Sequence, residues 1–453
     1  MNNIASRIDR LPSTPMLKKI LLLTGIGWMF DAMDQGMVAG VMASIGKDWG
    51  LSLGQAGFLG SIGLLGMALG AALSGMVADK WGRRTVIMLT LIIYGVASIL
   101  SGFAINYPML LVLRFITGFG LGGELPAAAT LISEFSPTKI RGRNVIFLES
   151  FWSWGWILAT LVSLLLIPAY GWRIAFIIGG VPALFAAFVR KAIPESPRYL
   201  ESVGKNKEAD DIVSKMEKQA GVMNSLGESE TNLQTETPKK HINFLDLWSK
   251  KYVRSTIVLW IIWFGINFGY YGFVLWTPSL LVTKGFTLVK SFEFIFIMCL
   301  AQLPGYFSAA YLVEKVGRKN VLSIYFAGTA LAAWLFGHAG STPEVLIYGC
   351  MLYFFSLGAW GCVYAYTPEV YPTAARASGS GWASAFGRLG AFVAPLVVPI
   401  IYKAYGSANG YAYVFIMFAL VFVTVAIVVG IFGKETMGKS LEEISGESQS
   451  IEE

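Results

Sequence analysis

Long apolar blocks, each about twenty residues and almost free of charge, follow one another along nearly the whole chain and constrain its fold more than any other feature. A helix of about 20 residues crosses the hydrocarbon core of a bilayer and satisfies its own backbone hydrogen bonds there. We therefore predict an all-α membrane protein with twelve transmembrane helices. Glycine pairs four residues apart, such as Gly66/Gly70 and Gly118/Gly122, indicate close helix packing. The predicted spans cover residues 20–42, 53–78, 86–105, 109–134, 144–167, 172–190, 254–282, 289–313, 320–338, 344–367, 379–402 and 411–433.

The composition excludes several classes of protein. Apolar residues make up 55% of the 453 residues, charged residues only 14%, and the mean hydropathy is +0.60. Disordered chains, disulfide-rich scaffolds and ordinary cytosolic enzymes differ from this composition. The net charge of +7 does not indicate a nucleic-acid partner, because the basic residues stand in short gaps between apolar blocks. The three cysteines stand in apolar stretches, and no catalytic residues cluster, so we expect no disulfide, metal site, cofactor or enzymatic activity.

The basic residues concentrate in every second gap between the predicted spans. Since Lys and Arg in short loops stay on the cytoplasmic side, we expect a multi-pass protein of the cell membrane with both termini in the cytoplasm. The polar stretch at residues 191–252 is predicted to be a cytoplasmic linker, at most partly helical. It separates an N-terminal six-helix half at residues 1–190 from a C-terminal half with a cytoplasmic tail at residues 253–453.

An acidic residue followed by basic residues recurs at one fixed offset. Residues 79–84 recur as residues 314–319, and residues 134–141 recur as residues 369–376, in both cases 235 positions later. Two motifs at one offset indicate a duplicated six-helix unit. Such residues can form ion pairs at helix ends that hold the two halves in one state and release them in another, although orientation by positive charge alone also explains them. The candidate gating residues are Asp79, Arg83, Arg84, Glu134, Arg141, Glu314, Arg318, Glu369 and Arg376.

Short motifs of charged residues and glycine stand in and after the predicted spans. They are Gly75-x-x-x-Asp79-x-x-Gly82-Arg83-Arg84, Arg114-x-x-Thr117-Gly118, Pro194-Glu195-Ser196-Pro197-Arg198, Asp34-x-Gly36-x-Val38-x-Gly40 and Glu435-Thr436-x-Gly438-Lys439-Ser440-Leu441. Together they resemble the signatures of the major facilitator superfamily, in particular its sugar-porter-like branch, over the whole chain. The resemblance implies two pseudo-symmetric six-helix halves. The glutamine pair that sugar porters carry in span seven is absent, and residues 265–271 of this chain do not favour a hexose substrate.

Four further segments resemble one group of transporters within this branch. They are Gly120-Leu-Gly-Gly-Glu124-Leu-Pro126, Leu148-Glu149-Ser150-Phe151-Trp152, Gly358-Ala-Trp360-Gly and Ala385-Phe-Gly-Arg388-Leu-Gly. They are similar to segments of the bacterial niacin transporters of the NiaP type, which are related to synaptic-vesicle transporter-like glycoproteins. This resemblance implies uptake of nicotinate or nicotinamide.

Ionisable residues inside the predicted spans are functional candidates, because a charge at bilayer depth is costly. Asp31 and Asp34 stand three residues apart on one face of the first span. By the resemblance, Asp34 occupies the position whose partner is the arginine of span four, here Arg114. Loss of an arginine partner favours protonation of a carboxylate, so Asp34, Asp31 and Arg114 are the candidates for proton coupling. A static ion pair is the alternative.

Arg388 is the first candidate for a substrate carboxylate, because a guanidinium holds a planar carboxylate through two hydrogen bonds and the small neighbours Gly387 and Gly390 would expose it to a cavity. A structural ion pair with Glu124 or Glu149 is the alternative. A pyridine ring also needs aromatic faces and a hydrogen bond to its nitrogen, although packing explains most membrane aromatics. The other substrate-binding candidates are Trp152, Tyr270, Tyr271, Gln302, Trp360, Tyr364, Glu149 and Glu124.

We predict a secondary active importer of nicotinate that works by alternating access, with its site near the membrane midplane. Protons are the expected coupling ion, carried by carboxylates, since the only histidines are His241 and His338. A transporter of another aromatic acid or of an organic cation is the near alternative, because four acids face two arginines in the spans. A non-transporting binding protein, like the synaptic-vesicle relatives, is the distant alternative. The expected partners are the substrate, protons and the lipid bilayer, with no nucleic acid, and we expect a monomer.

Overall fold

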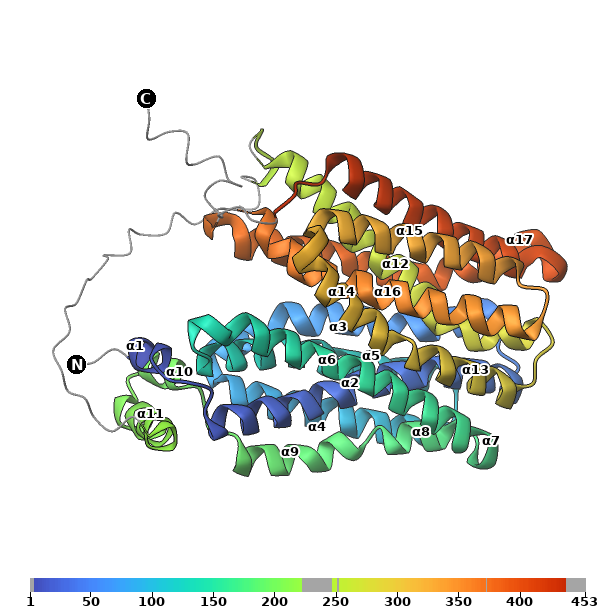
Figure 1. Cartoon of the computed structure of the whole chain (residues 1–453). Coiled ribbons are helices and arrows are strands. Elements are labelled where there is room, and N and C mark those ends of the chain that lie inside the picture. The colour runs from blue at the N-terminus through green and yellow to red at the C-terminus, as the bar shows by residue number, and fades with distance from the viewer. Residues whose placement is uncertain (1–3, 222–246, 251, 372, 437–453) are drawn as a thin grey trace. The chain divides into compact units, whose positions relative to one another are not determined.

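The computed structural model describes residues 4–221, 247–250, 252–371 and 373–436, and helices make up nearly all of them (Figure 1). The chain divides into two compact units. The first consists of Met1–Val41 and Ile62–Leu233, and the second consists of Met42–Ser61 and Gln234–Glu453. Each unit therefore combines two separate stretches of sequence.

Within the described residues, ten helices are long and apolar enough to cross a membrane. They coincide with ten of the twelve predicted windows. In the eighth, Leu288–Val316, a turn at Ala301 separates α13 (Leu288–Leu300) from α14 (Gln302–Val316). The first window lies within α2 (Pro15–Asp48), where two aspartates lower the hydropathy, and the sixth is covered by two shorter helices, α8 (Arg173–Ile178) and α9 (Val181–Ala192). Helices thus cover all twelve windows, and the prediction of an all-α membrane protein is confirmed.

The sixth predicted span is divided rather than continuous, and glycines explain the break. Gly179 and Gly180 separate α8 from α9 and lie against α4 (Arg83–Gly102). A Cβ atom on Gly179 would lie 2.3 Å from the Ser98 hydroxyl oxygen, and one on Gly180 would lie 2.0 Å from Cγ1 of Ile99. Only glycine lets this segment approach α4 so closely.

Most of the first unit is a bundle of long helices. In this unit α4 lies along α5 and also packs on α8 and α9. The unit includes α2 as far as Val41 and α3 from Ile62 onward. Besides the helices already given, its elements are α1 (Ile4–Asp9), α3 (Leu53–Trp81), α5 (Tyr107–Phe135), α6 (Thr138–Leu165), α7 (Ile167–Tyr170), α10 (Pro197–Ser202) and α11 (Asn206–Ala220).

Helices α3 and α5 touch backbone to backbone along paired glycines. A Cβ atom on Gly118 would lie 1.9 Å from the carbonyl oxygen of Gly63, and one on Gly66 would lie 2.2 Å from the carbonyl oxygen of Phe115. Gly70 and Gly122 face the opposite backbone in the same way. The predicted role of these glycines in close helix packing is confirmed.

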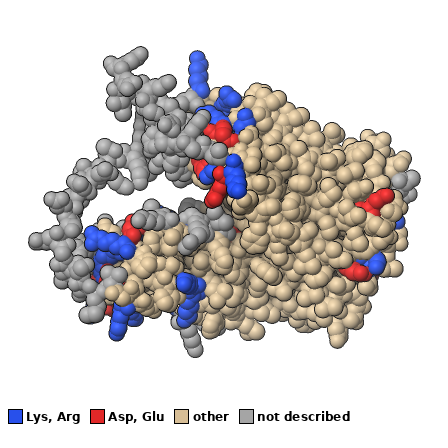
Figure 2. All heavy atoms as spheres, in the orientation of Figure 1, with Lys and Arg blue, Asp and Glu red and all other residues tan. Residues whose placement is uncertain are grey.

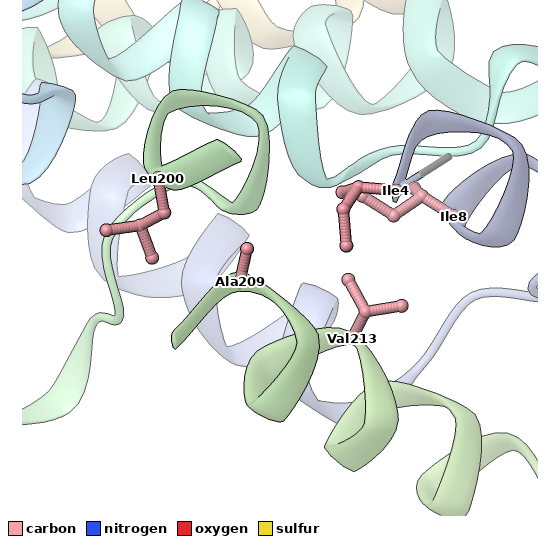
Figure 3. Packing of buried hydrophobic residues seen from close by; sticks show 5 residues of the cluster. All are labelled: Ile4, Ile8, Leu200, Ala209 and Val213. Atoms are coloured by element: carbon pink, nitrogen blue, oxygen red, sulfur yellow. The ribbon is translucent and has the colours of Figure 1, made fainter. Parts of the chain in front are cut away.

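A small apolar cluster joins α1 to the first part of the predicted linker. Its buried residues come from α1, α10 and α11 and point toward one another in Figure 3: Ile4, Ile8, Leu200, Ala209 and Val213. On the rim of the cluster, Arg7 forms an ion pair with Glu217 at 2.7 Å and another with Asp210. The hydrogen bond to Glu217 raises the pKa of Arg7 above its ordinary value. Residues 197–220 therefore fold as part of the first unit.

The second unit is built around α12 and α17, which lie side by side along much of their length. The helix α17 bends at Gly406, whose φ of 71° is left-handed, and this bend divides it into two candidate spans, Gly379–Gly406 and Asn409–Phe432. Helix α15 packs on both α16 and α17. The elements of this unit are α12 (Val253–Thr283), α13 (Leu288–Leu300), α14 (Gln302–Val316), α15 (Arg318–His338), α16 (Thr342–Val370) and α17 (Thr373–Phe432).

The outer surface of the spans is apolar. Large side chains such as Leu184, Phe307 and Leu420 are 78%, 66% and 62% exposed. On the face drawn in Figure 2, the charged side chains gather toward the helix ends and the surface between them carries none. Lipid, rather than water, is the solvent that suits such a surface.

Candidate functional site: buried charges and aromatic clusters

The structure brings Asp34 of α2 and Arg114 of α5 together in the interior of the first unit. The Nη2 atom of Arg114 lies 2.5 Å from Oδ2 of Asp34, and Nη1 lies 3.3 Å from Oδ1. Both residues are 0% exposed. The Ser98 hydroxyl of α4 donates a second hydrogen bond to Oδ1 at 2.8 Å, and the ring of Phe176 lies 4.8 Å from the guanidinium carbon. The guanidinium and the hydroxyl thus donate hydrogen bonds to the carboxyl group, and the aromatic face contacts the guanidinium.

Asp31, one turn before Asp34, faces Glu124 of α5. Both side chains are fully buried, and their four carboxyl oxygens have no hydrogen-bond partner among the described residues. The tip of Glu124 lies against the backbone of α2, because a Cβ atom on Gly27 would lie 2.2 Å from Oε1 of Glu124. Tyr94 of α4 approaches both carboxyl groups. Sequence reasoning missed Tyr94, because nothing in the spacing along the chain brings α4 to this point.

Aromatic residues of α2 and α6 lie beside this acidic cluster. The rings of Trp28 and Trp152 are 4.9 Å apart, and Trp156 is buried one turn further along α6. Glu149, one turn before Trp152, is half-buried and takes part in a further interaction within the described structure. Trp152 and Glu149, which were predicted to bind substrate, therefore lie one turn apart on α6, and Trp152 contacts Trp28 of α2.

A second aromatic cluster lies in the second unit around Trp360 of α16. Its ring centroid is 6.0 Å from that of Tyr270, 5.6 Å from that of Tyr364 and 5.9 Å from that of Trp263. Tyr271 contacts Tyr270 at 5.5 Å. The structure thus brings four predicted residues together. It adds Trp263, whose Nε1–H donates to the Thr367 hydroxyl at 3.0 Å and which the seven-residue spacing to Tyr270 places on the same helix face.

Gln302 and Arg388, the two other substrate-binding candidates of the second unit, are not among the residues of this aromatic cluster. Gln302, at the start of α14, is fully buried, and its Oε1 has no hydrogen-bond partner among the described residues. Arg388 of α17 is half-buried and forms no ion pair within the described part of its unit. Its small neighbours face α12: a Cβ atom on Gly387 would lie 2.8 Å from the Trp263 carbonyl oxygen, and one on Gly390 would lie 2.5 Å from the Phe264 carbonyl oxygen. These glycines let α17 approach α12.

The first copy of the repeated charged motif forms a network at the start of α4. Arg83 pairs with Glu134 of α5 at 3.2 Å. The carboxylate of Glu195 accepts hydrogen bonds from the backbone N–H groups of Arg83 at 3.0 Å and of Arg84 at 3.2 Å. Arg141 lies 3.7 Å from Asp9 of the N-terminal segment. The side chain of Asp79 lies outside the described residues.

The second copy repeats this arrangement at the start of α15. Arg318 pairs with Glu369 of α16 at 3.2 Å, and its backbone N–H donates to Glu435 at 3.0 Å. The Thr436 hydroxyl donates to Glu369 at 2.6 Å. Glu314 is exposed and forms no ion pair with the described residues, and the side chain of Arg376 lies outside them.

Glycine is required where each network meets its helix. Gly82 and Gly317 have φ values of 94° and 97°, which L side chains rarely adopt. A Cβ atom on Gly82 would lie 2.3 Å from Oε2 of Glu195, and one on Gly317 would lie 2.5 Å from Oε2 of Glu435. Glu195 and Glu435 were quoted as parts of family motifs, but their contacts with the repeated motif were not foreseen.

Replacing Glu195 with alanine should lower the stability of the protein by about 1–3 kcal/mol, because the N–H groups of Arg83 and Arg84 lose their acceptor. The thermal unfolding midpoint of the purified protein in detergent measures this loss. Glu201→Ala, at an exposed carboxylate of α10, is the matched control and should leave the midpoint unchanged. An equal midpoint for both variants would mean that the capping hydrogen bonds do not stabilise the unit.

Comparison with known proteins defines the class to which this arrangement belongs. Residues 35–447 match the family described as "Sugar (and other) transporter". The chain belongs to this transporter family. Its backbone is similar to the crystal structure of a D-xylose-proton symporter, with a TM-score of 0.75 and 21% identity over 93% of this chain and 99% of that one. The predicted fold of the major facilitator superfamily is confirmed.

Within the family, the chain is most usefully compared with three curated relatives. It is 47% identical to the "Niacin transporter NiaP" of Acinetobacter baylyi, over 98% of this chain and 99% of that protein. It is 41% identical to the "Putative niacin/nicotinamide transporter NiaP" of Bacillus subtilis, over 94% and 98%. It is 30% identical to the "Synaptic vesicle 2-related protein" of Xenopus laevis, over 85% and 73%. The resemblances predicted from the motifs are confirmed.

Proposed function

We propose that the protein is a secondary active importer of nicotinate in the plasma membrane, working by alternating access. The observation that carries the proposal is the 47% identity to a niacin transporter over nearly the full length of both chains. The charges and rings of the interior suit such a substrate. Trp360 with its tyrosines offers aromatic faces to a pyridine ring, and Arg388 offers a guanidinium to its carboxylate.

Protons are the coupling ion in this proposal. Asp34 and Arg114 are the candidate coupling pair, because a carboxylate that exchanges an arginine for a proton changes charge at bilayer depth. The capping networks around Arg83 and Arg318 are proposed to stabilise one state of the cycle. Both termini lie in the cytoplasm, as the distribution of Lys and Arg indicates, and the protein works as a monomer without cofactor or enzymatic activity.

One observation favours a second candidate substrate. Among the described residues of the first unit, the buried charged groups are the carboxyl groups of Asp31, Asp34 and Glu124 and a single arginine, Arg114. An excess of buried acid attracts cations, so an organic cation is the alternative substrate. Binding without transport, as in a receptor on this scaffold, is a more distant candidate.

Direct uptake separates these candidates. Proteoliposomes that contain the protein should accumulate radiolabelled nicotinate when a proton gradient points inward, and should only equilibrate it when the gradient is collapsed. In a parallel thermal-shift experiment with nicotinate, nicotinamide, benzoate and choline, the tight ligands raise the unfolding midpoint. Stabilisation by choline without uptake of nicotinate would support the organic cation instead. Binding of nicotinate without transport would support the receptor.

Replacing Arg388 with lysine should weaken nicotinate binding by roughly 10- to 100-fold, because an ammonium group cannot make two parallel hydrogen bonds to a carboxylate. The dissociation constant is measured by calorimetry on the purified protein. Lys403→Arg, at an exposed position of the same helix, is the matched control. Unchanged affinity in a folded Arg388→Lys protein would remove Arg388 from the binding site.

A further inference from the structure

Asp31 and Glu124 form a pair of carboxyl groups that the protein neither exposes to water nor neutralises. Both side chains are 0% exposed, and none of the four oxygens has a hydrogen-bond partner among the described residues. The two groups nevertheless lie close enough to interact electrostatically with each other and with Tyr94. The Tyr94 side chain is also 0% exposed, and its hydroxyl also has no hydrogen-bond partner among the described residues.

The neighbouring charged groups do not balance the negative charge that Asp31 and Glu124 would carry if both were ionised. Arg114 is held by both oxygens of Asp34, and Asp34 itself adds negative charge on the same face of α2. Tyr94 approaches from α4, and Glu149 of α6 and Glu134 at the end of α5 are the remaining acids in the spans of this unit. Residues 62–78 of α3 contain no ionisable side chain. Within the described residues of the first unit, no cation therefore faces Asp31 or Glu124.

Two adjacent carboxylates cannot both stay ionised in such surroundings. Burial removes the water that stabilises each charge, and the two charges repel each other at short range. When like carboxyl groups share a buried site, one of them keeps a proton, and the protonated group can then donate a hydrogen bond to its ionised neighbour. Asp34 differs in this respect, because both of its carboxyl oxygens have partners, two contacts with Arg114 and the hydroxyl of Ser98.

We propose that Asp31 and Glu124 share one proton and form a proton-binding site of the transporter, separate from the Asp34–Arg114 pair. The proton lies between one carboxyl oxygen of Asp31 and one of Glu124, so the pair carries a single negative charge rather than two. Tyr94 is a positioning residue, whose hydroxyl is placed to donate to the ionised carboxylate. Release of the proton leaves two buried negative charges, and it therefore requires that water or a cation reach the pair.

The shared proton explains how the transporter can keep a proton bound during a conformational cycle. This role of the site rests on the proposed function. A proton shared by two acids away from solvent does not exchange while the site is closed. Movement of the surrounding helices then decides on which side of the membrane it is released. This is the requirement that coupling of a proton to an anionic substrate imposes on its carrier.

The proton itself is observed by infrared spectroscopy of the purified full-length protein in liposomes at neutral pH. The carbonyl stretch of a protonated carboxyl group should be present in the unmodified protein and absent from the double variant Asp31→Asn/Glu124→Gln. Each single variant should keep a band at a shifted frequency, because the hydrogen-bond partner becomes an amide. Glu208→Gln, at an exposed carboxylate of α11, should leave the spectrum unchanged. A double variant with the same band as the unmodified protein would overturn the proposal, whether or not nicotinate is transported.

The role in coupling is tested by uptake in proteoliposomes. Asp31→Asn should lose accumulation driven by a proton gradient, down to the level reached without a gradient, and should keep exchange of internal for external nicotinate. Glu124→Gln should lose the gradient-driven accumulation as well. Tyr94→Phe removes a donor to the ionised carboxylate, so the proton is held to higher pH and the pH profile of uptake should shift upward. Full gradient-driven accumulation in both acid variants would overturn the coupling role. If the unmodified protein does not transport nicotinate, the proposed function fails, and the infrared result still decides whether the proton is shared.

Discussion

Replacing Arg114 with leucine should destabilise the protein by about 3–5 kcal/mol, because Asp34 is left as a buried carboxylate without its partner. The two residues are 0% exposed, so water does not replace the lost guanidinium. The Ser98 hydroxyl alone then faces the carboxylate.

A double-variant cycle in detergent measures this interaction. Asp34→Asn/Arg114→Leu removes both charges and should recover most of the stability that Arg114→Leu loses, because a neutral amide needs no counter-ion. The measured quantity is the midpoint of thermal unfolding for the unmodified protein, the two single variants and the double variant. If the double variant is no more stable than Arg114→Leu, loss of packing around α5 explains the effect better than loss of charge.

Replacing Asp34 with asparagine should abolish the accumulation of nicotinate driven by a proton gradient and preserve exchange across the membrane. Asparagine keeps the size and one oxygen of aspartate, so it accepts a hydrogen bond from Arg114 but cannot take up a proton. Two assays on the same proteoliposomes separate the effects: uptake with an inward proton gradient, and exchange of unlabelled for radiolabelled nicotinate without one.

The control for this experiment lies on the same helix. Asp48→Asn changes an exposed aspartate near the end of α2 and should leave both assays unchanged. Accumulation by Asp34→Asn equal to that of the unmodified protein would show that Asp34 does not carry the proton. Loss of both accumulation and exchange would indicate instead that the Asp34–Arg114 pair is needed for the conformational change itself.

The helices of this protein are predictable from its sequence because a bilayer restricts a chain so strongly. Length and hydropathy are sufficient to locate a membrane span, and a helix occupies every predicted window. The division of the sixth span was not predictable, because it depends on the approach of Gly179 and Gly180 to Ser98 and Ile99 of another helix. Hydropathy does not report such contacts.

Contacts of the candidate site could be predicted where family motifs identify both residues. They could not be predicted where only the packing of helices brings two residues together. The contact between Asp34 and Arg114 was expected from resemblance to a family. The contact of Asp31 with Glu124 joins α2 to α5 without a repeated spacing, and only the packing of these helices shows it. The roles of Glu195 and Glu435 were missed for a related reason: they lie 112 and 117 positions after their partners Arg83 and Arg318, so the fixed offset of the repeat does not connect them.

The hydrogen bonds of Glu195 and Glu435 also bear on the order in which the chain is made. Domains fold largely as units, the N-terminal one first, while the polypeptide is being synthesised. The first network needs no residue beyond Ser196, so it can close long before the ribosome reaches α12. The second needs Glu435 and Thr436, which follow α17, and it can close only after that helix has been synthesised. A product that stops at Phe432 would contain every described membrane span and still lack the contact that secures α15.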